Sequence, residues 1–261
     1  DGSAAPLPKH PVLCTDKVRH VGDSVAFVVA ETLAEAKAAA ELVEVDYEML
    51  DAVADTVLTL EDGQPLVHDE VANNLAYDWD YGDEAANATI FDSAAHVVKL
   101  DLVNNKVVVA SMEPRGALAE FDEAAGKLTM HTGTQGVWIV RNHIADDVLK
   151  VEKEKVRVIT ADVGGGFGMK GMLYPEHGMV SWAARKLKRP VKWIEDRREH
   201  LMATNHSRQQ HHRIRAAVAA DGEVLAIDDE LYLDQGAYIR THGTRVANLT
   251  TGTLPGLYRF P

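Results

Sequence analysis

The chain has 261 residues, of which 46% are hydrophobic, and its formal net charge is −13, from 27 Lys and Arg against 40 Asp and Glu. This length allows one large domain or two smaller ones, each with a buried core. An acidic surface repels the phosphate backbone, so no nucleic-acid partner is expected. No run of 18 apolar residues occurs, and no membrane span is expected.

Two features of the sequence bear on the cellular compartment, namely its cysteine content and its N-terminal residues. Cys14 is the single cysteine, which excludes an internal disulfide and favours a reducing, cytoplasmic location. The first residues, Asp1 to Pro6, contain no initiator Met, no basic segment and no apolar segment. They predict a start within a longer protein, not a signal peptide.

The N-terminal part predicts a small β-α-β unit over residues 16–50. Val25 to Ala30 is an apolar, β-rich run, and Thr32 with Glu35 forms a capping box that opens an alanine-rich helix. Val43 to Tyr47 alternates apolar and polar residues, as a half-buried strand does. Residues 51–82 are irregular and acidic, with a turn signal at Asp62 to Pro65, and predict a surface connector.

The rest of the chain predicts further strands with interspersed helices, which defines an α+β fold class. Asp83 is expected to cap the first of these helices. The expected elements are helix 84–94, a strand–turn–strand over 96–109, a hairpin over 118–130, helix 136–149, strand 156–163, helix 174–187, strand 190–194, helix 196–203, and a hairpin of 209–219 with 224–233. The tail, 236–261, is expected to be a loop.

The most informative segment is the glycine-rich run Gly164 to Gly171. Glycine allows positive φ and close approach of backbone N–H groups to a ligand. Successive N–H donors form a nest that suits an anion or a metal-oxo oxygen. The run is not a Walker loop, because Met169 precedes Lys170 and Gly171 stands where Ser or Thr is required.

The same run contains a literal G-x-G-x-x-G from Gly166 to Gly171, which leaves a dinucleotide-binding interpretation open. Glu195 or Asp196, after the next strand, would then bind the ribose. Against this interpretation, the following helix is expected to start only near Tyr174, too late for a tight fingerprint turn. A glycine turn without any ligand is the third possibility.

The segment Thr132 to Gly136 joins a strand to a helix, and helix N-termini attract negatively charged groups. Gln135 offers an amide donor that adds no charge. Taken alone, such a glutamine is more often a helix-capping or surface residue.

Other polar clusters favour structural roles. Asn205 to His212 predicts a polar strand start, because adjacent histidines on a strand face opposite sides and no cysteine joins them. Glu195–Asp196 and Glu199–His200 are interpreted as helix-start carboxylates and surface pairs. Glu113 and Arg115 are expected to pair with each other or to contact a ligand, and a structural role is favoured.

Taken together, these segments resemble the large subunit of the molybdenum hydroxylases, the family of xanthine dehydrogenase, aldehyde oxidase and carbon monoxide dehydrogenase. The resemblance covers nearly the whole chain and rests on the order of its motifs. The matching segments are Val18 to Asp23 with Val25–Ala26, Met112 to Gly116, Gly133 to Gly136, Asp162 to Gly168, and Asp234 to Tyr238. The segment Lys192 to His200 looks most like the carbon monoxide dehydrogenase-type branch.

The resemblance implies an α/β hammerhead domain over residues 1–55, truncated at its N-terminus, a connector over 56–82, and the first part of a molybdopterin-binding domain over 83–261. It implies that Gln135 hydrogen-bonds an oxo ligand of molybdenum without ligating the metal itself. The remaining cofactor-binding residues implied are backbone contacts, namely Gly136, Gly165, Gly166, Phe167 and Gly168.

The resemblance also implies the wider enzyme. It would oxidise a small carbon substrate, such as carbon monoxide, an aldehyde or an N-heterocycle, with water as the oxygen source. The molybdopterin is expected in its cytosine dinucleotide form, and iron–sulfur clusters and FAD would lie on partner subunits. Purine-oxidising relatives carry Glu directly after the lysine of the glycine loop, whereas this chain has Gly171, which argues against a xanthine-type substrate.

The chain ends at Tyr258 to Pro261, and the resemblance places the general-base glutamate beyond that point. No catalytic residue is therefore expected in this chain, which alone would be inactive and would need the remaining C-terminal part of the subunit. An incomplete cofactor domain should also expose a large apolar face. Two alternatives stay open: an NAD(P)-binding oxidoreductase that uses residues 166–171, and a non-catalytic scaffold.

Overall fold

The computed structural model describes residues 6–240 and 243–259. The expected mid-protein start at Asp1 to Ala5 and the chain end at Phe260–Pro261 lie outside the described residues. Helices and strands are interspersed, which confirms the α+β class. Within the described residues, no helix is both long enough and apolar enough to cross a membrane.

The described chain divides into two compact units, each assembled from separate stretches of sequence. We call them unit 1 and unit 2. Unit 1 contains residues 1–9, 49–107 and 207–261, and unit 2 contains residues 10–48 and 108–206. The two short strands β2 (Val107–Val108) and β7 (His206–Ser207), at which the chain changes unit, pair with each other.

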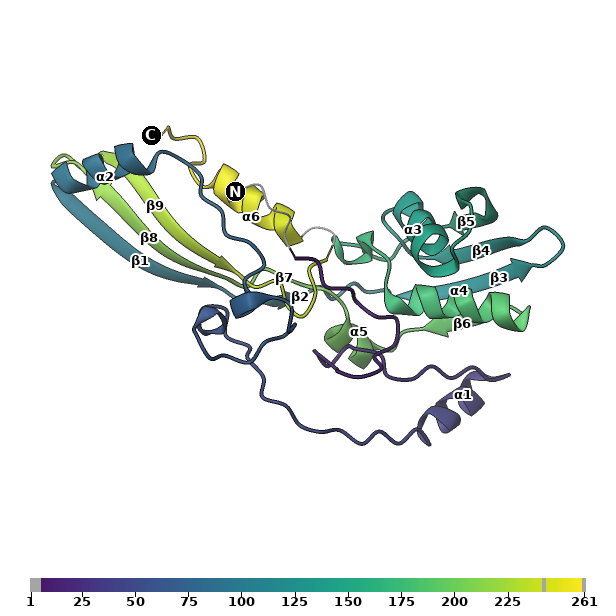
Figure 1. The fold of residues 1–261 in the computed structure, drawn as a ribbon. Helices are drawn as coiled ribbons and strands as arrows, with labels where there is room; N and C mark the ends of the chain where they lie inside the picture. The colour runs from purple at the N-terminus through teal and green to yellow at the C-terminus, as the bar shows by residue number, and fades with distance from the viewer. Residues whose placement is uncertain (1–5, 241–242, 260–261) are drawn as a thin grey trace. The chain divides into compact units, whose positions relative to one another are not determined.

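Unit 1 is built on a three-stranded antiparallel sheet in the order β1-β8-β9 (Figure 1). The helix α2 packs against β9 and β8, and Asn87 of α2 donates a hydrogen bond to the Ile227 carbonyl of β9 at 3.0 Å. The bounds are α2 Glu84–Ser93, β1 His96–Asn104, β8 Gln210–Val218, β9 Val224–Leu233 and α6 Gly243–Thr253, with 3-10 turns η1 Leu58–Leu60 and η2 Ala72–Asn74. The expected hairpin of β8 and β9 is confirmed.

The strand β1 is exposed along its whole length. Its apolar side chains include Val98 and Val103, which are 56% and 61% exposed. The large exposed apolar face expected from the sequence stays a prediction.

Unit 2 is built on a four-stranded mixed sheet in the order β5-β4-β3-β6, in which β4 and β5 are parallel and the other pairs antiparallel. The helix α4 packs against β3 and β6, and α3 packs against β5 (Figure 1). The core is formed by apolar side chains of this sheet and these helices, with Met130, Val140 and Val180 fully buried. The bounds are β3 Gly116–Asp122, β4 Lys127–Thr132, α3 Val137–His143, β5 Val156–Ile159, α4 Pro175–Leu187, β6 Val191–Ile194 and α5 Arg197–Ala203.

Shorter helical turns complete unit 2. A π turn, η3 (Ile144–Leu149), continues α3, so the single helix expected over 136–149 changes its hydrogen-bond pattern at Ile144. The others are the 3-10 turns η4 Lys153–Lys155 and η5 Met169–Gly171. The expected hairpin of β3 and β4 and the late start of α4, with Tyr174 as its N-cap, are confirmed.

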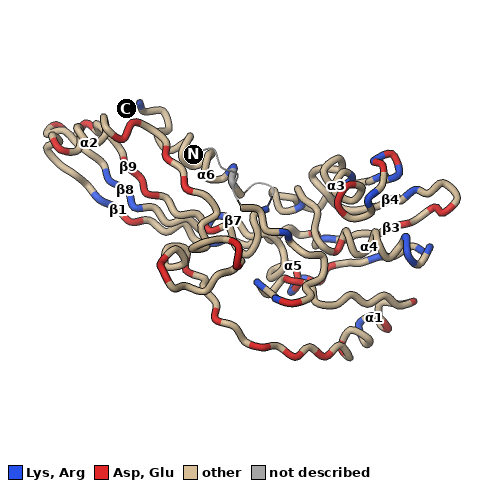
Figure 2. The backbone as a smooth tube through the Cα atoms, viewed as in Figure 1, with Lys and Arg blue, Asp and Glu red and all other residues tan. Residues whose placement is uncertain are grey.

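The expected β-α-β unit at the N-terminus is confirmed only in its helix. The helix α1 (Leu33–Ala40) begins with the capping box of Thr32 and Glu35. The flanking segments 25–30 and 43–47 are not strands. Acidic residues recur along the chain after α1 (Figure 2), and residues 43–48 are exposed on both faces. Alternation predicts which face a strand buries, but a strand also needs a hydrogen-bonded neighbour.

The two strands expected over 96–109 are present as β1 and β2, which pair with β8 and β7 and not with each other. One further prediction is wrong. The tail is not all loop, because it contains α6. Threonine and glycine lower the helix propensity of α6. The Thr250 hydroxyl donates back to the Val246 carbonyl at 2.9 Å. Gln210 of β8 also donates to the Thr250 hydroxyl at 2.9 Å.

Candidate functional site

The glycine loop follows β5 and leads into η5, all within unit 2. Three of its residues have positive φ, namely Gly165 at 102°, Phe167 at 50° and Gly168 at 84°. Glycine adopts such values without cost, but for Phe167 they are strained. The Phe167 side chain is 77% exposed, so packing within the described chain does not explain the strain. Strain of this kind is characteristic of ligand-binding loops.

The loop presents a row of backbone donors. The N–H of Gly164 donates to Glu113 Oε2 at 2.9 Å and that of Gly168 to Gln135 Oε1 at 2.9 Å. Between them, the N–H groups of Gly165, Gly166 and Phe167 have no hydrogen-bond acceptor among residues 6–240 and 243–259. Consecutive free donors of this type form a cradle for an anion or for the oxygen of a metal-oxo group.

Gln135 lies directly against this loop. A Cβ added at Gly166 would lie only 2.5 Å from Gln135 Cδ, so a glycine at 166 permits the approach. The Gln135 backbone N–H donates to the Lys170 carbonyl at 3.0 Å. The Gln135 side-chain oxygen accepts a hydrogen bond from the Gly168 N–H. The –NH2 group of the same amide has no acceptor in the described part of the chain. The amide is therefore available as a neutral donor next to the free N–H groups.

Glu113 and Lys170 form an ion pair beneath the loop. Lys170 Nζ donates to Glu113 Oε2 at 2.6 Å, and its side chain is 1% exposed. The hydrogen bond from Lys170, ahead of the burial that opposes it, lowers the pKa of the Glu113 carboxyl below its ordinary value. Glu113 was expected to pair with Arg115 or with a ligand, and the structure instead gives it Lys170.

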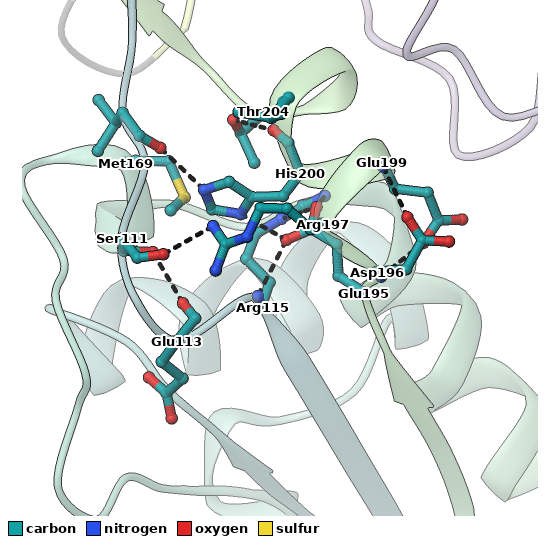
Figure 3. A network of polar contacts seen from close by, with 12 residues as sticks. Ser111, Glu113, Arg115, Met169, Glu195, Asp196, Arg197, Glu199, His200 and Thr204 are labelled. Carbon is teal, nitrogen blue, oxygen red and sulfur yellow. Dashed lines mark hydrogen bonds and ion pairs between the residues drawn. The ribbon is translucent and has the colours of Figure 1, made fainter.

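Arg115 belongs to a buried network of hydrogen bonds and ion pairs (Figure 3). Its guanidinium donates to Glu195 Oε1 at 2.5 Å and to both oxygens of Glu176 at 3.1 and 3.2 Å, and it lies 3.8 Å from the centre of the Tyr174 ring. Burial opposes the charge of Arg115, but the two carboxylates outweigh it and raise the Arg115 pKa. Glu195 in turn has a lowered pKa, because its bonds to Arg115 and His200 outweigh its burial.

Glu195 and His200 were expected at the surface, and this prediction is wrong. They are 2% and 0% exposed, and His200 Nδ1 lies 2.8 Å from Glu195 Oε2. The prediction of helix-start carboxylates holds for Asp196 and Glu199, which form the capping box of α5. Arg197 extends from α5 to the Ser111 and Met112 carbonyls, at 2.8 and 2.7 Å (Figure 3). The network thus ties α5 and β6 to the segment that carries Glu113.

The residues proposed from the sequence to bind cofactor lie together in unit 2. Gly136 is the N-cap of α3, and its N–H donates to the Thr134 hydroxyl at 3.1 Å. Gln135 and the loop residues Gly165, Gly166, Phe167 and Gly168 are brought together as described. The motif at 234–238 lies in unit 1. The sequence did not predict that Lys170 and Glu113 contact the loop. The one signal for it was that Lys170 is a single cation within an otherwise neutral glycine-rich run.

No group of three or more His, Cys, Asp or Glu side chains that could hold a metal ion occurs in the described ranges. The histidines of the 205–212 segment have separate partners. His212 Nδ1 lies 2.7 Å from Asp229 Oδ2, and His211 Nε2 lies 3.7 Å from Asp101 Oδ1. Adjacent histidines on β8 therefore face different neighbours.

Comparison with known proteins places this geometry in a family. Residues 67–261 match the molybdopterin cofactor-binding domain, and residues 2–51 match the a/b hammerhead domain of aldehyde oxidase and xanthine dehydrogenase. The chain is 36% identical, over 97% of its length, to the gamma subunit of the 6-hydroxypseudooxynicotine dehydrogenase complex of Paenarthrobacter nicotinovorans. It is 31% identical, over 87% of its length, to the carbon monoxide dehydrogenase large chain of Hydrogenophaga pseudoflava.

Among solved structures, quinoline 2-oxidoreductase from Pseudomonas putida 86 matches with a TM-score of 0.88 and 34% identity, over 96% of this chain and 32% of that one. The chain spans 31% and 30% of the two curated relatives named above, about a third of their length. The family resemblance drawn from the motifs is confirmed, and the chain belongs to the molybdopterin cofactor-binding domain family of the molybdenum hydroxylases.

Proposed function

We propose that unit 2 supplies part of the molybdenum-cofactor site of a molybdenum hydroxylase. The proposed contacts are the Gln135 amide and the backbones of Gly136, Gly165, Gly166, Phe167 and Gly168. The observation that carries this proposal is the row of three free N–H donors at 165–167 beside the free amide of Gln135. The family membership supplies the identity of the group that this cradle would receive.

The donors fit such a group in chemistry and in charge. Backbone N–H groups and a side-chain amide are neutral donors, which suit oxo and phosphate oxygens. When bound, the molybdenum cofactor supplies oxidation of a carbon centre with water as the oxygen source.

The chain's own residues then have two tasks. The N–H groups of 165–167 bind and orient oxygen atoms without adding charge, because their positions are fixed by the folded loop. The Gln135 amide would donate its hydrogens to the same group, while its side-chain carbonyl oxygen accepts the Gly168 N–H at 2.9 Å. Preorganised donors of this kind stabilise negative charge on an oxygen more than mobile water does. We assign no general base to the described residues and expect it beyond Pro261.

The wider enzyme follows from the relatives by analogy. Their names give nicotine derivatives, carbon monoxide and quinoline, so we propose a small carbon compound or N-heterocycle as substrate. We propose the cytosine dinucleotide form of the pterin, iron–sulfur and FAD-binding partner subunits, and the remaining C-terminal part of the molybdenum subunit. Residues 1–55 would be the hammerhead domain, 56–82 the connector and 83–261 the first part of the cofactor domain. We propose a cytoplasmic location for the enzyme.

The dinucleotide alternative has less support. Of the two carboxylates that would bind a ribose, Glu195 is buried against Arg115 and Asp196 caps α5. Lys170 and Gly171 are buried, and α4 begins only at Pro175. The scaffold alternative keeps the same fold without cofactor, and only a direct measurement separates it from our proposal.

The test measures molybdenum and pterin in the full-length protein purified from its own host with its associated subunits. We expect about one molybdenum per protomer. In Gln135→Ala, the cofactor should dissociate about tenfold faster or more, since a hydrogen bond to a charged group contributes roughly 1.5–3 kcal/mol. Gln64→Ala removes an amide in unit 1 and is the matched control. Wild-type protein free of molybdenum and pterin would refute the proposal, and bound NAD would then establish the alternative.

A further inference from the structure

Lys170 is a cation buried under the glycine loop, and its charge needs a partner there. Its side chain is 1% exposed, and its Nζ donates to Glu113 Oε2 at 2.6 Å. A buried charge is tolerated when it is paired and hydrogen-bonded. Glu113 is 43% exposed, so the carboxylate has access to water and is nevertheless turned inward toward the lysine. This ion pair is therefore a feature that the local fold holds in place.

The lysine backbone joins the loop to the Gln135 segment. The Lys170 carbonyl accepts hydrogen bonds from Gln135 N at 3.0 Å and from the Thr134 hydroxyl at 3.0 Å. A Cβ added at Gly133 would lie 3.2 Å from Glu113 Oε2 and 3.8 Å from Lys170 Nζ, so the ion pair also packs against this segment. The Lys170 backbone is therefore linked directly to the backbone of Gln135.

Glu113 fixes the first residue of the loop. The same oxygen that binds Lys170 accepts the Gly164 N–H at 2.9 Å, and the Glu113 N–H donates to the Gly164 carbonyl at 3.1 Å. A Cβ at Gly164 would lie 2.6 Å from the Glu113 Cβ, which shows how closely the two backbones approach. One carboxylate oxygen thus binds both the start of the loop and the lysine at its end.

We propose that the Glu113–Lys170 ion pair is a positioning device that sets the spacing between the glycine loop and the Gln135 segment. This inference rests on the proposed function, because the spacing matters when the N–H groups of 165–167 and the Gln135 amide bind one cofactor. Hydrogen bonds to charged groups are shorter and stronger than neutral ones, and the paired charges therefore hold the two backbones more firmly. Glu113 and Lys170 act through Gly164 and Gln135 and do not touch the cofactor in this scheme.

The experiment measures amide hydrogen exchange in the full-length protein, with and without cofactor. Lys170→Met keeps the apolar stem and leaves Glu113 solvated. Glu113→Gln keeps an acceptor for Gly164 and removes the charge, and it serves as a second variant if the first fails to fold. Lys188→Met is the matched control, because Lys188 pairs with Glu123 at the surface of the same unit, where the two side chains are 58% and 63% exposed.

We expect the peptides that contain Gly164 and Gln135 to exchange about tenfold faster in both loop variants, which corresponds to roughly 1.4 kcal/mol. Exchange of β3 and β4 should stay unchanged, and Lys188→Met should match wild type throughout. In the loaded protein, molybdenum should dissociate faster in the loop variants by a similar factor. A merely stabilising ion pair would instead speed exchange across the whole sheet of unit 2.

The proposal is overturned if exchange at Gly164 and Gln135 stays within twofold of wild type, or if β3 and β4 lose protection equally. Failure of the proposed function is seen separately, as wild-type protein that binds no molybdenum or pterin. In that case the comparison of exchange rates in the cofactor-free protein still decides whether the ion pair positions the two segments.

Discussion

Acidification is expected to destabilise unit 2 through His177, which lies in the first turn of α4 and is 3% exposed. The Tyr174 N–H donates to His177 Nδ1 at 3.1 Å. His177 Nε2 lies 3.2 Å from the Thr132 hydroxyl, which itself donates to the Gly116 carbonyl at 2.7 Å. The ring therefore fits as a neutral imidazole with its hydrogen on Nε2, and a proton on Nδ1 would break the bond to Tyr174.

Burial, and then the charge of Arg115 against the opposing effect of Glu195, lowers the pKa of His177 from 6.5 to about 3. As the pH falls below 6.5, the unfolded chain binds a proton at this position and the folded chain does not. The free energy of unfolding then decreases by about 1.4 kcal/mol per pH unit, or roughly 2.7 kcal/mol over two units. The loss is absent above the unfolded pKa and is complete near pH 3.

His177→Gln should remove this dependence, because glutamine at the same position can still accept the N-cap N–H without titrating. The assay is urea unfolding at about pH 7, 5.5 and 4.5, followed by tryptophan fluorescence, with the slope against pH compared between variants. His206→Gln, at an exposed histidine, is the control. Carboxylates such as Glu195 and Glu113 add their own acid dependence in all variants alike. An unchanged slope in His177→Gln would refute the assignment.

Two further predictions concern stability. Arg115→Met should lower the free energy of unfolding by about 3–5 kcal/mol, because it leaves Glu195 buried without its cation. Adding Glu195→Gln to this variant should recover part of the loss. A loss below about 1 kcal/mol in Arg115→Met would contradict the buried network. Asp83→Ala should lower the free energy of unfolding by about 1 kcal/mol, measured by thermal unfolding, because the Asp83 side chain caps α2 by accepting the Ala86 N–H at 3.0 Å. Asp92→Ala on the same helix is the control, and an equal loss in both variants would contradict the cap.

Elements with local signals were predicted well from the sequence. The caps at Thr32, Asp83 and Asp196 depend on residues three positions apart, so the sequence contains the whole interaction. The hairpin of β3 and β4 is equally local. The prediction of a strand over 43–47 was wrong because an alternating pattern does not reveal whether a neighbouring strand exists to pair with it. The helix α6 was missed because threonine and glycine have low helix propensity, and its contact with Gln210 of β8 is between residues 40 positions apart.

The site was predictable in its backbone and not in its ion pairs. Glycine content and motif order predicted the loop and Gln135, which the structure brings together. The partner of Lys170 lies 57 residues away and that of Arg115 lies 80 residues away. No periodicity connects residues at such separations, so Glu195 was misplaced at the surface and Glu113 was assigned the wrong neighbour. Pairings of this kind are fixed only by the three-dimensional fold.

The pairing of β1 with β8 has a consequence for synthesis of the chain on the ribosome. Asn104 of β1 is opposite Gln210 of β8, so 106 residues must be added before the first of these partners is made. At about 5–20 residues per second, β1 waits roughly 5–20 s without its neighbour. The unpaired backbone edge of β1 is open to non-native strand pairing during this interval, and a chaperone that binds extended segments would act on β1 before any other strand of unit 1.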